Sequence, residues 1–214
     1  SLLKVPLADV KRTAREAQTT VNVVFLGAVA EAVGRYHRAN GYDLPSMRVN
    51  MPISIRTPED AATGNHWVPA RFVVPTQEIP LEHRLYQLDG LVHTARKDPA
   101  LKFADGVYKA LALLPDPVTS RIAGALMKGV DVAATNVPGP PVPVYLCGAR
   151  VRAIIPFAPK SGAALNISFM SYDEDAFIGI NADPAAVEDP AELVRHLADA
   201  FDELTQARLT PGAE

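Results

Sequence analysis

The sequence is poor in the features that mark secreted and membrane-spanning proteins. It has one cysteine, Cys147, which rules out an internal disulfide and fits a reducing compartment. We expect this cysteine to be a small, buried, apolar residue. No window approaches the roughly 18 uninterrupted apolar residues of a membrane span. The best window, residues 21–33, contains Asn22 and Glu31, so we expect no transmembrane segment.

Clustered basic residues are also lacking. The formal net charge is −3 and the sequence pI is about 6.0, which gives a nucleic-acid partner little support. The densest basic stretch, Lys11 to Arg15, is better interpreted as the solvated face of a helix. Residues Ser1 to Asp9 lack the basic start and long apolar run of a secretion signal. Because the first residue is Ser1, we expect further residues upstream.

No self-contained catalytic constellation is present. The sequence has no Gly-x-Ser-x-Gly elbow, glycine-rich phosphate loop, His-Glu-x-x-His helix or Cys-x-x-Cys pair. None of the five histidines has a second His or Cys at metal-ligand spacing, so we predict no metal site. His66 follows Gly64-Asn65 in a predicted loop, where functional residues often lie; the other four are His37, His83, His93 and His196.

What the sequence does have is alternating helical and strand patterning. Of its 214 residues, 48% are hydrophobic, which suffices for one large domain. Helical spacing predicts helices over about 6–18, 21–40, 81–95 and 189–204, with further helix over 105–128 broken near Pro115 and Pro117. Strand patterning is found over 47–55, 67–74, 130–137, 165–170 and 177–180. We therefore predict one α/β domain over residues 1–214, a mixed β-sheet with packed helices.

The predicted helix over residues 21–40 has two distinct faces. One is an apolar stripe with Asn22 at its amino end, and its neighbour is a stripe of small residues that would let another element approach closely. The small residues are Val23, Gly27, Ala30 and Gly34. A buried amide without partners costs about 1–3 kcal/mol, so something should bond to Asn22. Asn22 either makes an internal hydrogen bond to a neighbouring loop or to the start of the helix, or it lies at an interdomain channel.

Residues 136–143, Asn-Val-Pro-Gly-Pro-Pro-Val-Pro, are the most constrained local sequence in the chain. Pro138-Gly139 suits a type II turn, and the flanking prolines fix φ and remove hydrogen-bond donors. This loop either reverses the chain between strands or forms a rigid lip beside a ligand passage, where stiffness limits the entropy lost on binding.

The ordered set of segments resembles the C-terminal region of the wax ester synthase/diacylglycerol acyltransferase family, over about residues 6–204. The most specific piece is Asn136-Val137-Pro138-Gly139-Pro140. The other segments are Thr20-Val-Asn-Val-Val-Phe25, Val49-Asn-Met-Pro-Ile-Ser-Ile-Arg56, Gly64-Asn65, Val144-Tyr-Leu-Cys-Gly148 and Ser168-Phe-Met-Ser-Tyr172.

The resemblance implies one half of a chloramphenicol acetyltransferase-like fold, in which two α/β halves enclose a tunnel. Family members carry His-His-x-x-x-Asp-Gly in the N-terminal half, where the second His takes a proton from the acceptor hydroxyl and the oxygen attacks an acyl-CoA thioester. This chain contains no His-His, so the resemblance implies no catalytic residue here and a tunnel-shaping role. It implies acyl-CoA as substrate rather than cofactor, with a fatty alcohol or diacylglycerol as acceptor.

The resemblance also implies individual site residues, by their position in the matching motifs. Asn22 matches the Asn of the family's Asn-Asp motif, Asn136 to Pro140 its Asn-Val-Pro-Gly-Pro loop, and Ser171-Tyr172 a Ser-Tyr pair near its C-terminus. Arg56 is similar to an arginine that pairs with the Asp of the catalytic motif in related folds; it either orients the base loop or is an exposed loop arginine. Val23 stands where the family usually has Asp, which puts full activity in question.

Three functions remain open. The first is an acyltransferase half, the second a noncatalytic lipid-binding or partner module favoured by Val23, and the third a related condensation-type acyltransferase with another donor. An isolated half should expose apolar surface where its partner belongs, which predicts association with the N-terminal half or a homodimer. The resemblance implies a cytoplasmic protein that can lie peripherally at a membrane or lipid droplet.

Overall fold

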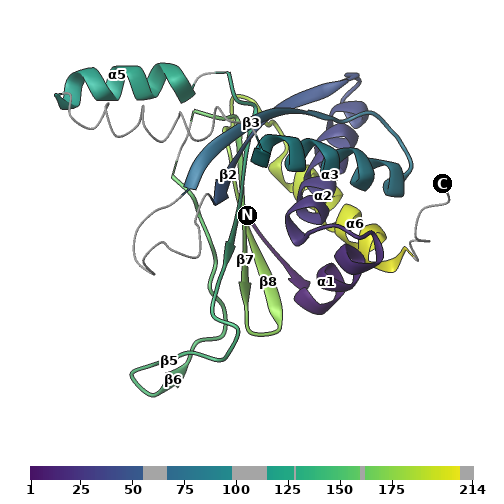
Figure 1. The fold of residues 1–214 in the computed structure, drawn as a ribbon, viewed down its shortest axis with the longest axis vertical. Coiled ribbons are helices and arrows are strands. Elements are labelled where there is room, and N and C mark those ends of the chain that lie inside the picture. Colours follow the sequence, from purple (N-terminus) through teal and green to yellow (C-terminus); the bar gives the residue numbers. More distant parts are fainter. Residues whose placement is uncertain (55–66, 98–114, 128, 160–161, 208–214) are drawn as a thin grey trace.

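Six strands form one mixed sheet in the computed structural model of the chain, which describes residues 1–54, 67–97, 115–127, 129–159 and 162–207 (Figure 1). The strand order is β1-β8-β7-β4-β2-β3. The parallel pairs are β2 with β4 and β4 with β7, and the other three pairs are antiparallel. The strands are β1 (Leu2–Pro6), β2 (Ser46–Ser54), β3 (Trp67–Pro75), β4 (Val132–Pro138), β7 (Leu165–Tyr172) and β8 (Asp175–Ala182).

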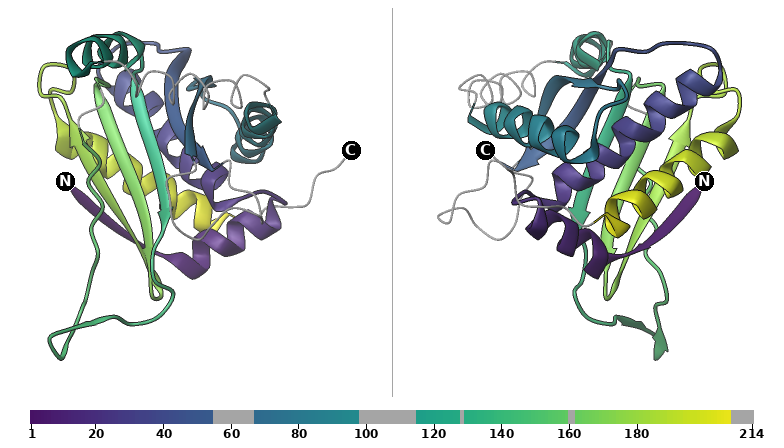
Figure 2. Two further views of the ribbon diagram at one scale, coloured as in Figure 1. Left: turned by 60° about the vertical axis from the view of Figure 1, so that its left-hand side comes forward. Right: turned by 90° about the vertical axis from the view of Figure 1, so that its right-hand side faces the viewer.

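Four helices cover one face of this sheet (Figure 2). They are α1 (Leu7–Glu16), α2 (Val21–Ala39), α3 (Leu81–Lys97) and α6 (Pro190–Gln206). Helices α2 and α6 run side by side across the strands, and α5 (Asp116–Met127) lies apart from them. The predicted mixed sheet with packed helices is therefore confirmed.

Helix α2 is the centre of the core, because residues 23–34 are all buried whichever way their side chains point. Its small-residue face works as predicted: Leu85 and Leu88 of α3 pack over Gly27, and the carbonyl oxygen of Thr76 lies against Gly34, where a Cβ would overlap with it. A helix buried all round needs such close neighbours, since larger side chains would hold them apart.

Several local predictions are confirmed. Asp189 caps α6 by accepting hydrogen bonds from the backbone N–H groups of Ala191 (2.9 Å) and Glu192 (3.0 Å), with Pro190 at the first helical position. The Asp189 N–H donates to the Tyr36 hydroxyl (3.2 Å), a tertiary contact that replaces the reciprocal bond of a capping box. The predicted hairpin of residues 165–180 is β7 and β8, and the basic residues near the start of the chain lie on the exposed face of α1.

Other predictions were wrong in detail. Pro6 is the N-cap of α1 rather than its first helical residue, because Leu2–Pro6 forms an edge strand paired with β8. Cys147 is exposed, since it lies in the turn of a small hairpin with φ 50°, followed by Gly148 with φ 81°. That hairpin is β5 (Tyr145–Leu146) and β6 (Ala149–Arg150).

A charged cluster ties α2 to its neighbours. Glu31, 6% exposed, accepts hydrogen bonds from Arg84 of α3 (2.6 Å) and Arg35 (2.8 Å), and Arg38 lies 3.5 Å from it. Arg84, 1% exposed, also donates to the carbonyls of Pro75 (3.0 Å) and Gln77 (2.6 Å). The pKa of the Arg84 guanidinium lies below its usual value, mainly because burial lowers it, although the neighbouring Glu31 raises it. The pair thus fastens α2, α3 and the end of β3 together.

Replacing Arg84 with methionine should lower the free energy of unfolding by about 3 kcal/mol, because the buried Glu31 carboxylate loses one of its donors and two partly buried carbonyls lose theirs. The matched control is Glu203→Gln, which breaks the bond between Arg35 and a side chain that is 53% exposed. An exposed pair contributes less than about 1 kcal/mol. Urea denaturation of both variants measures the difference, and equal losses would contradict the structural role given to Arg84.

Candidate functional site

The residues singled out in the sequence meet at one end of the sheet, where the parallel strands β4 and β7 finish. Asn136 to Pro138 close β4, and Ser171-Tyr172 close β7, with Pro138 opposite Ser171 in the register. Asn22 lies in the first turn of α2. We call Asn22, residues 136–140 and Ser171-Tyr172 the motif cluster. Ligands of open α/β sheets commonly bind beyond the carboxyl ends of the strands.

An amide pair joins α2 to β4. The side-chain nitrogen of Asn136 donates to the side-chain oxygen of Asn22, and both residues are half-buried. The bonding partner expected for Asn22 is therefore another residue of the cluster. Thr20 is the N-cap of α2 but makes no side-chain cap bond, and the first turn contains no acidic residue. Val23, where the family has Asp, is fully buried.

Glycine 139 allows two backbones to approach closely. Its N–H donates to the Ser171 hydroxyl (3.2 Å), and a Cβ at this position would overlap with the Ser171 carbonyl oxygen. The expected type II turn at Pro138-Gly139 was wrong, because that turn needs a positive φ at Gly139, which this residue does not have. The position demands glycine for space rather than for a left-handed backbone.

Tyr172 fastens the loop that follows β4. It is buried, with 3% exposed, and its hydroxyl accepts a hydrogen bond from the Val144 N–H (2.9 Å) and donates one to the Val151 carbonyl (2.8 Å). Next to it, the Asp173 N–H donates to the Pro140 carbonyl (3.0 Å), and Arg150 pairs with the Asp173 carboxylate (2.8 Å). The two sides of the loop are thus fixed to the end of β7.

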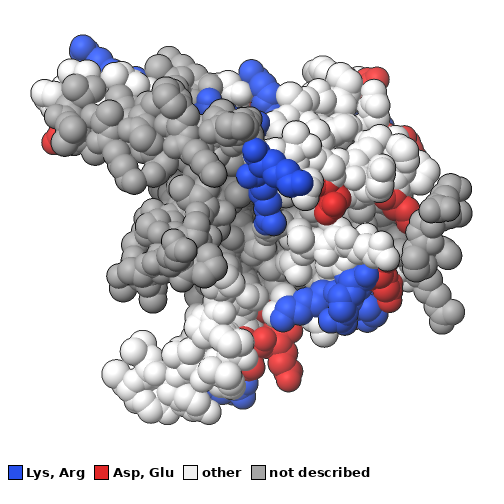
Figure 3. Space-filling view, viewed as in Figure 1, with Lys and Arg blue, Asp and Glu red and all other residues white. Residues whose placement is uncertain are grey.

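We call the hydrogen bonds of Tyr172 to Val144 and Val151 the clasp. Here the chain projects as an arm, residues 141–150, that carries β5 and β6 away from the sheet (Figure 1). Val142, Tyr145 and Leu146 are 59%, 63% and 70% exposed. Arg150 is its one charged residue, and the arm is correspondingly almost free of charge in the space-filling view (Figure 3). After it, residues 151–159 lie along the sheet: Asn181 and Asn166 donate to the carbonyls of Ala158 and Pro159 (both 3.2 Å).

The structure thus brings together all the predicted site residues that it describes. Asn22, Asn136, Gly139, Pro140 and Ser171 are half-buried, Tyr172 is buried, and Val137 and Pro138 are exposed. Arg56 and His66 lie outside the described residues. Within the described part of the chain, His37, His83, His93 and His196 belong to α2, α3 and α6 and make no hydrogen bond to the cluster. The cluster therefore presents amides, a hydroxyl and stiff backbone.

Sequence reasoning missed the arm's clasp and the charged cluster around Glu31. The signal for Glu31 was present, since a carboxylate within an apolar helix that proves buried must find partners. No sequence signal tied Tyr172 to Val144 and Val151, because those bonds depend on the register between distant segments. At the end of the sheet opposite the motif cluster, the structure also has a cavity of about 380 Å³ beside α2 and α6.

No single helix in the described residues is long and apolar enough to cross a membrane; α1 and α2 pass that test of length and composition only together, as a pair bent by 99°.

Comparisons with known proteins agree with the family resemblance of the sequence motifs. The family model described as the WS/DGAT C-terminal domain matches residues 64–205. The protein tgs1 of Mycobacterium tuberculosis, named a probable diacylglycerol O-acyltransferase, is 31% identical over 95% of this chain. Another relative from that organism with the same activity in its name, Tgs4, is 32% identical over 97% of the chain. The chain covers only 46% and 45% of these two relatives.

Solved structures show the same fold. A wax ester synthase/diacylglycerol acyltransferase from Marinobacter aquaeolei VT8 matches with a TM-score of 0.68 and 19% identity, over 95% of this chain and 47% of that one. A condensation domain of the enacyloxin polyketide synthase matches with a TM-score of 0.60 and 16% identity, over 100% of this chain and 42% of that one. The predicted half of an acyltransferase-like fold is therefore confirmed.

Replacing Tyr172 with phenylalanine should lower the free energy of unfolding by about 1 kcal/mol or more, because the Val144 N–H and the Val151 carbonyl lose their shared partner. Hydrogen exchange at the Val144 amide should accelerate. Tyr145→Phe, which removes a hydroxyl from the exposed arm, is the matched control and should leave both readings unchanged. Unaltered exchange at Val144 in Tyr172→Phe would show that the hydroxyl does not hold the arm.

Replacing Gly139 with alanine should destabilise the chain, because the new methyl group must push β4 away from Ser171. Gly90 of α3 is the control, since a Cβ there meets nothing within 4 Å. Alanine at that helical position should stabilise the chain by up to about 1 kcal/mol. Thermal unfolding distinguishes the two outcomes, and a neutral Gly139→Ala would mean that the close approach is relaxed in solution.

Proposed function

Because the chain belongs to the wax ester synthase/diacylglycerol acyltransferase family, as its C-terminal domain, we propose that it forms one wall of an acyl-CoA-dependent O-acyltransferase active site whose general base lies on another part of the protein. The acyl donor would be a long-chain acyl-CoA, and the acceptor a fatty alcohol or diacylglycerol. The product would be a wax ester or triacylglycerol.

The observation that carries this proposal is the composition of the motif cluster. Acyl transfer to an alcohol needs a group that takes the hydroxyl proton near neutral pH, and histidine is the usual one. Asn22, Asn136 and Ser171 cannot do this, since amides and hydroxyls do not act as bases at neutral pH. The cluster can orient and enclose substrates, so the base must come from elsewhere.

The described histidines do not supply that base. His37 is on the same helix as Asn22 but fifteen residues further along, which corresponds to about 22 Å of helix. A general base must come within hydrogen-bond reach of the proton it removes. The family's His-His-x-x-x-Asp-Gly motif, absent from this sequence, would provide it from the N-terminal half.

The projecting arm would contact that half. Its exposed Val142, Tyr145 and Leu146 form an apolar surface with little charge around it, and such surfaces mark sites of interaction. The clasp at Tyr172 would transmit the arm's position to the end of β7, beside the motif cluster. The exposed Val137 and Pro138 would then line the passage between the two halves, a stiff surface that loses little entropy on binding.

A noncatalytic lipid-binding or partner module is the second candidate, and Val23 favours it. A fully buried aliphatic side chain occupies the place of the family's acidic residue, so whatever that carboxylate holds in related enzymes is not held in the same way here. Retained acyl-CoA binding without turnover in the assembled protein would support this candidate. Either function could be carried out peripherally at a membrane or lipid droplet in the cytoplasm.

The proposal predicts that this chain alone makes no ester from acyl-CoA and a fatty alcohol or diacylglycerol. Ester formation should appear when the polypeptide with His-His-x-x-x-Asp-Gly, encoded in the same or an adjacent reading frame, is co-expressed with it. Radiolabelled product analysis measures both. Turnover by the purified chain alone at an enzyme-like rate would refute the proposal, as would a complete gene that lacks the motif.

A further inference from the structure

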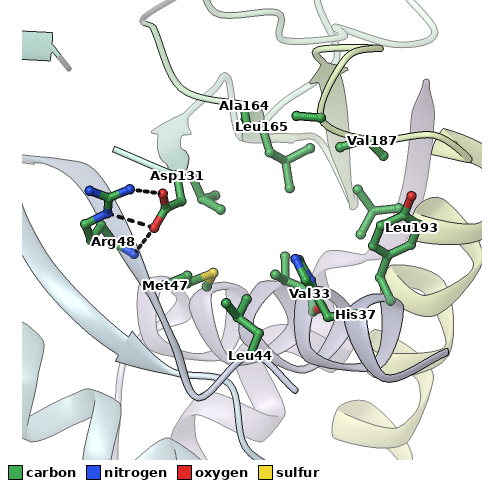
Figure 4. A pocket seen from close by; sticks show the side chains of 13 residues that line it. Val33, His37, Leu44, Met47, Arg48, Asp131, Ala164, Leu165, Val187 and Leu193 are labelled. Carbon is green, nitrogen blue, oxygen red and sulfur yellow. Dashed lines mark hydrogen bonds and ion pairs between the residues drawn. The ribbon is translucent and has the colours of Figure 1, made fainter. Parts of the chain in front are cut away.

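The cavity beside α2 and α6 lies at the end of the sheet opposite the motif cluster, where β2, β4 and β7 begin (Figure 4). Its volume is about 380 Å³, within the range of roughly 300–1,000 Å³ that small-molecule sites occupy. The aliphatic side chains that form its walls come from five elements and the segment before α6. They include Val33, Met47, Val132, Leu165, Val187 and Leu193.

The walls favour an alkyl chain. Apart from Tyr36, His37 and the charged pair Arg48 and Asp131, the lining side chains are aliphatic, so they offer methyl and methylene contacts rather than an aromatic slot. Removal of an alkyl chain from water against such walls is favourable. The Tyr36 hydroxyl accepts from the Asp189 N–H (3.2 Å) and keeps its own O–H as a donor.

Apart from the Tyr36 hydroxyl, the polar side-chain groups of the lining lie at two places. Arg48 and Asp131 form a bidentate ion pair (3.0 and 2.5 Å), and the Arg48 N–H also donates to Asp131 (2.7 Å). His37 Nδ1 lies 2.9 Å from the Val33 carbonyl oxygen. A carbonyl oxygen can only accept, so Nδ1 carries the hydrogen and Nε2 of the neutral ring is an acceptor.

Both places therefore offer acceptors. A carboxylate has about four acceptor positions, of which Arg48 fills three on Asp131. The hydrogen bonds from Arg48 hold the pKa of the Asp131 carboxyl below its usual value, so the group is ionised at neutral pH. A hydroxyl can donate to Asp131 or to His37 and also accept from the N–H groups of Arg48 that Asp131 does not use. A ligand carboxylate can only accept, so it would leave the acceptors of Asp131 and His37 without a donor and bring a second negative charge near Asp131.

We propose that this cavity is a binding site for one medium-length alkyl chain that ends in a neutral hydroxyl group. The chain would lie between α2, α6 and the sheet, with its hydroxyl directed at the Asp131 carboxylate or His37 Nε2. The site is distinct from the motif cluster, because α2, β4 and β7 each reach the two features with opposite ends. The inference does not rest on the catalytic proposal.

Titration of the full 214-residue chain with 1-decanol, followed by amide chemical shifts, tests the location without any substitution. Saturable shifts are expected at Met47, Val132 and Leu193. Shifts confined to Asn136 and Tyr172 would place the alcohol at the motif cluster and overturn the inference, as would the absence of saturable binding. Failure of ester formation would leave this result unaffected.

A matched pair of substitutions tests the cavity itself. Ala186 is exposed and borders the cavity, whereas its exposed neighbour Ala185 does not. Ala186→Trp should obstruct the opening and weaken 1-decanol binding at least tenfold, and Ala185→Trp should bind as the unsubstituted chain does. Equal affinities in the two variants, with thermal unfolding showing both to be folded, would overturn the assignment.

The head group is tested with ligands of the same chain length. Decanoate should bind at least tenfold more weakly than 1-decanol at neutral pH, because its charge faces Asp131. Asp131→Asn should reduce this discrimination, since the opposing charge is removed. Equal binding of decanoate and 1-decanol to the unsubstituted chain would refute the preference for a hydroxyl.

Discussion

The buried carboxylate of Glu31 is the constraint on which the rest of the structure depends. It lies in the middle of α2, where every surrounding side chain is buried, and a charge in such a place is tolerated only when it is paired and hydrogen-bonded. Arg84 meets that requirement and at the same time holds the carbonyls of Pro75 and Gln77. The position of α3 and of the chain after β3 is thereby tied to α2.

Helix α2 in turn sets the geometry of both the motif cluster and the apolar cavity. Its nineteen residues span about 28 Å, so one end reaches the motif cluster through Asn22 and the other reaches the apolar cavity through Val33 and His37. The parallel strands β4 and β7 run between the same two ends. A sheet with its parallel strands side by side necessarily collects their carboxyl ends at one edge, which is where the family's motifs gather.

In the proposed function the motif cluster is a scaffold rather than a reaction centre. Its hydrogen bonds run between its own members, from Asn136 to Asn22 and from Gly139 to Ser171, or to the arm, from Val144 to Tyr172. Such bonds fix backbone positions and leave no group able to accept a proton from an alcohol. Val137 and Pro138 are exposed beside these bonds, as is much of the arm.

Local sequence alone determined the elements whose signals lie within a few residues. The cap at Asp189, the hairpin of β7 and β8 and the small-residue face of α2 were predictable, because capping and periodicity are short-range effects. The ordered motifs also predicted the family and its half-fold. Only the tertiary structure decided that Leu2–Pro6 is a strand, that Cys147 is exposed and that Tyr172 clasps the arm. The strand and the clasp depend on partners far away in sequence, which no local pattern identifies, and the exposure of Cys147 follows from how far its hairpin projects from the core.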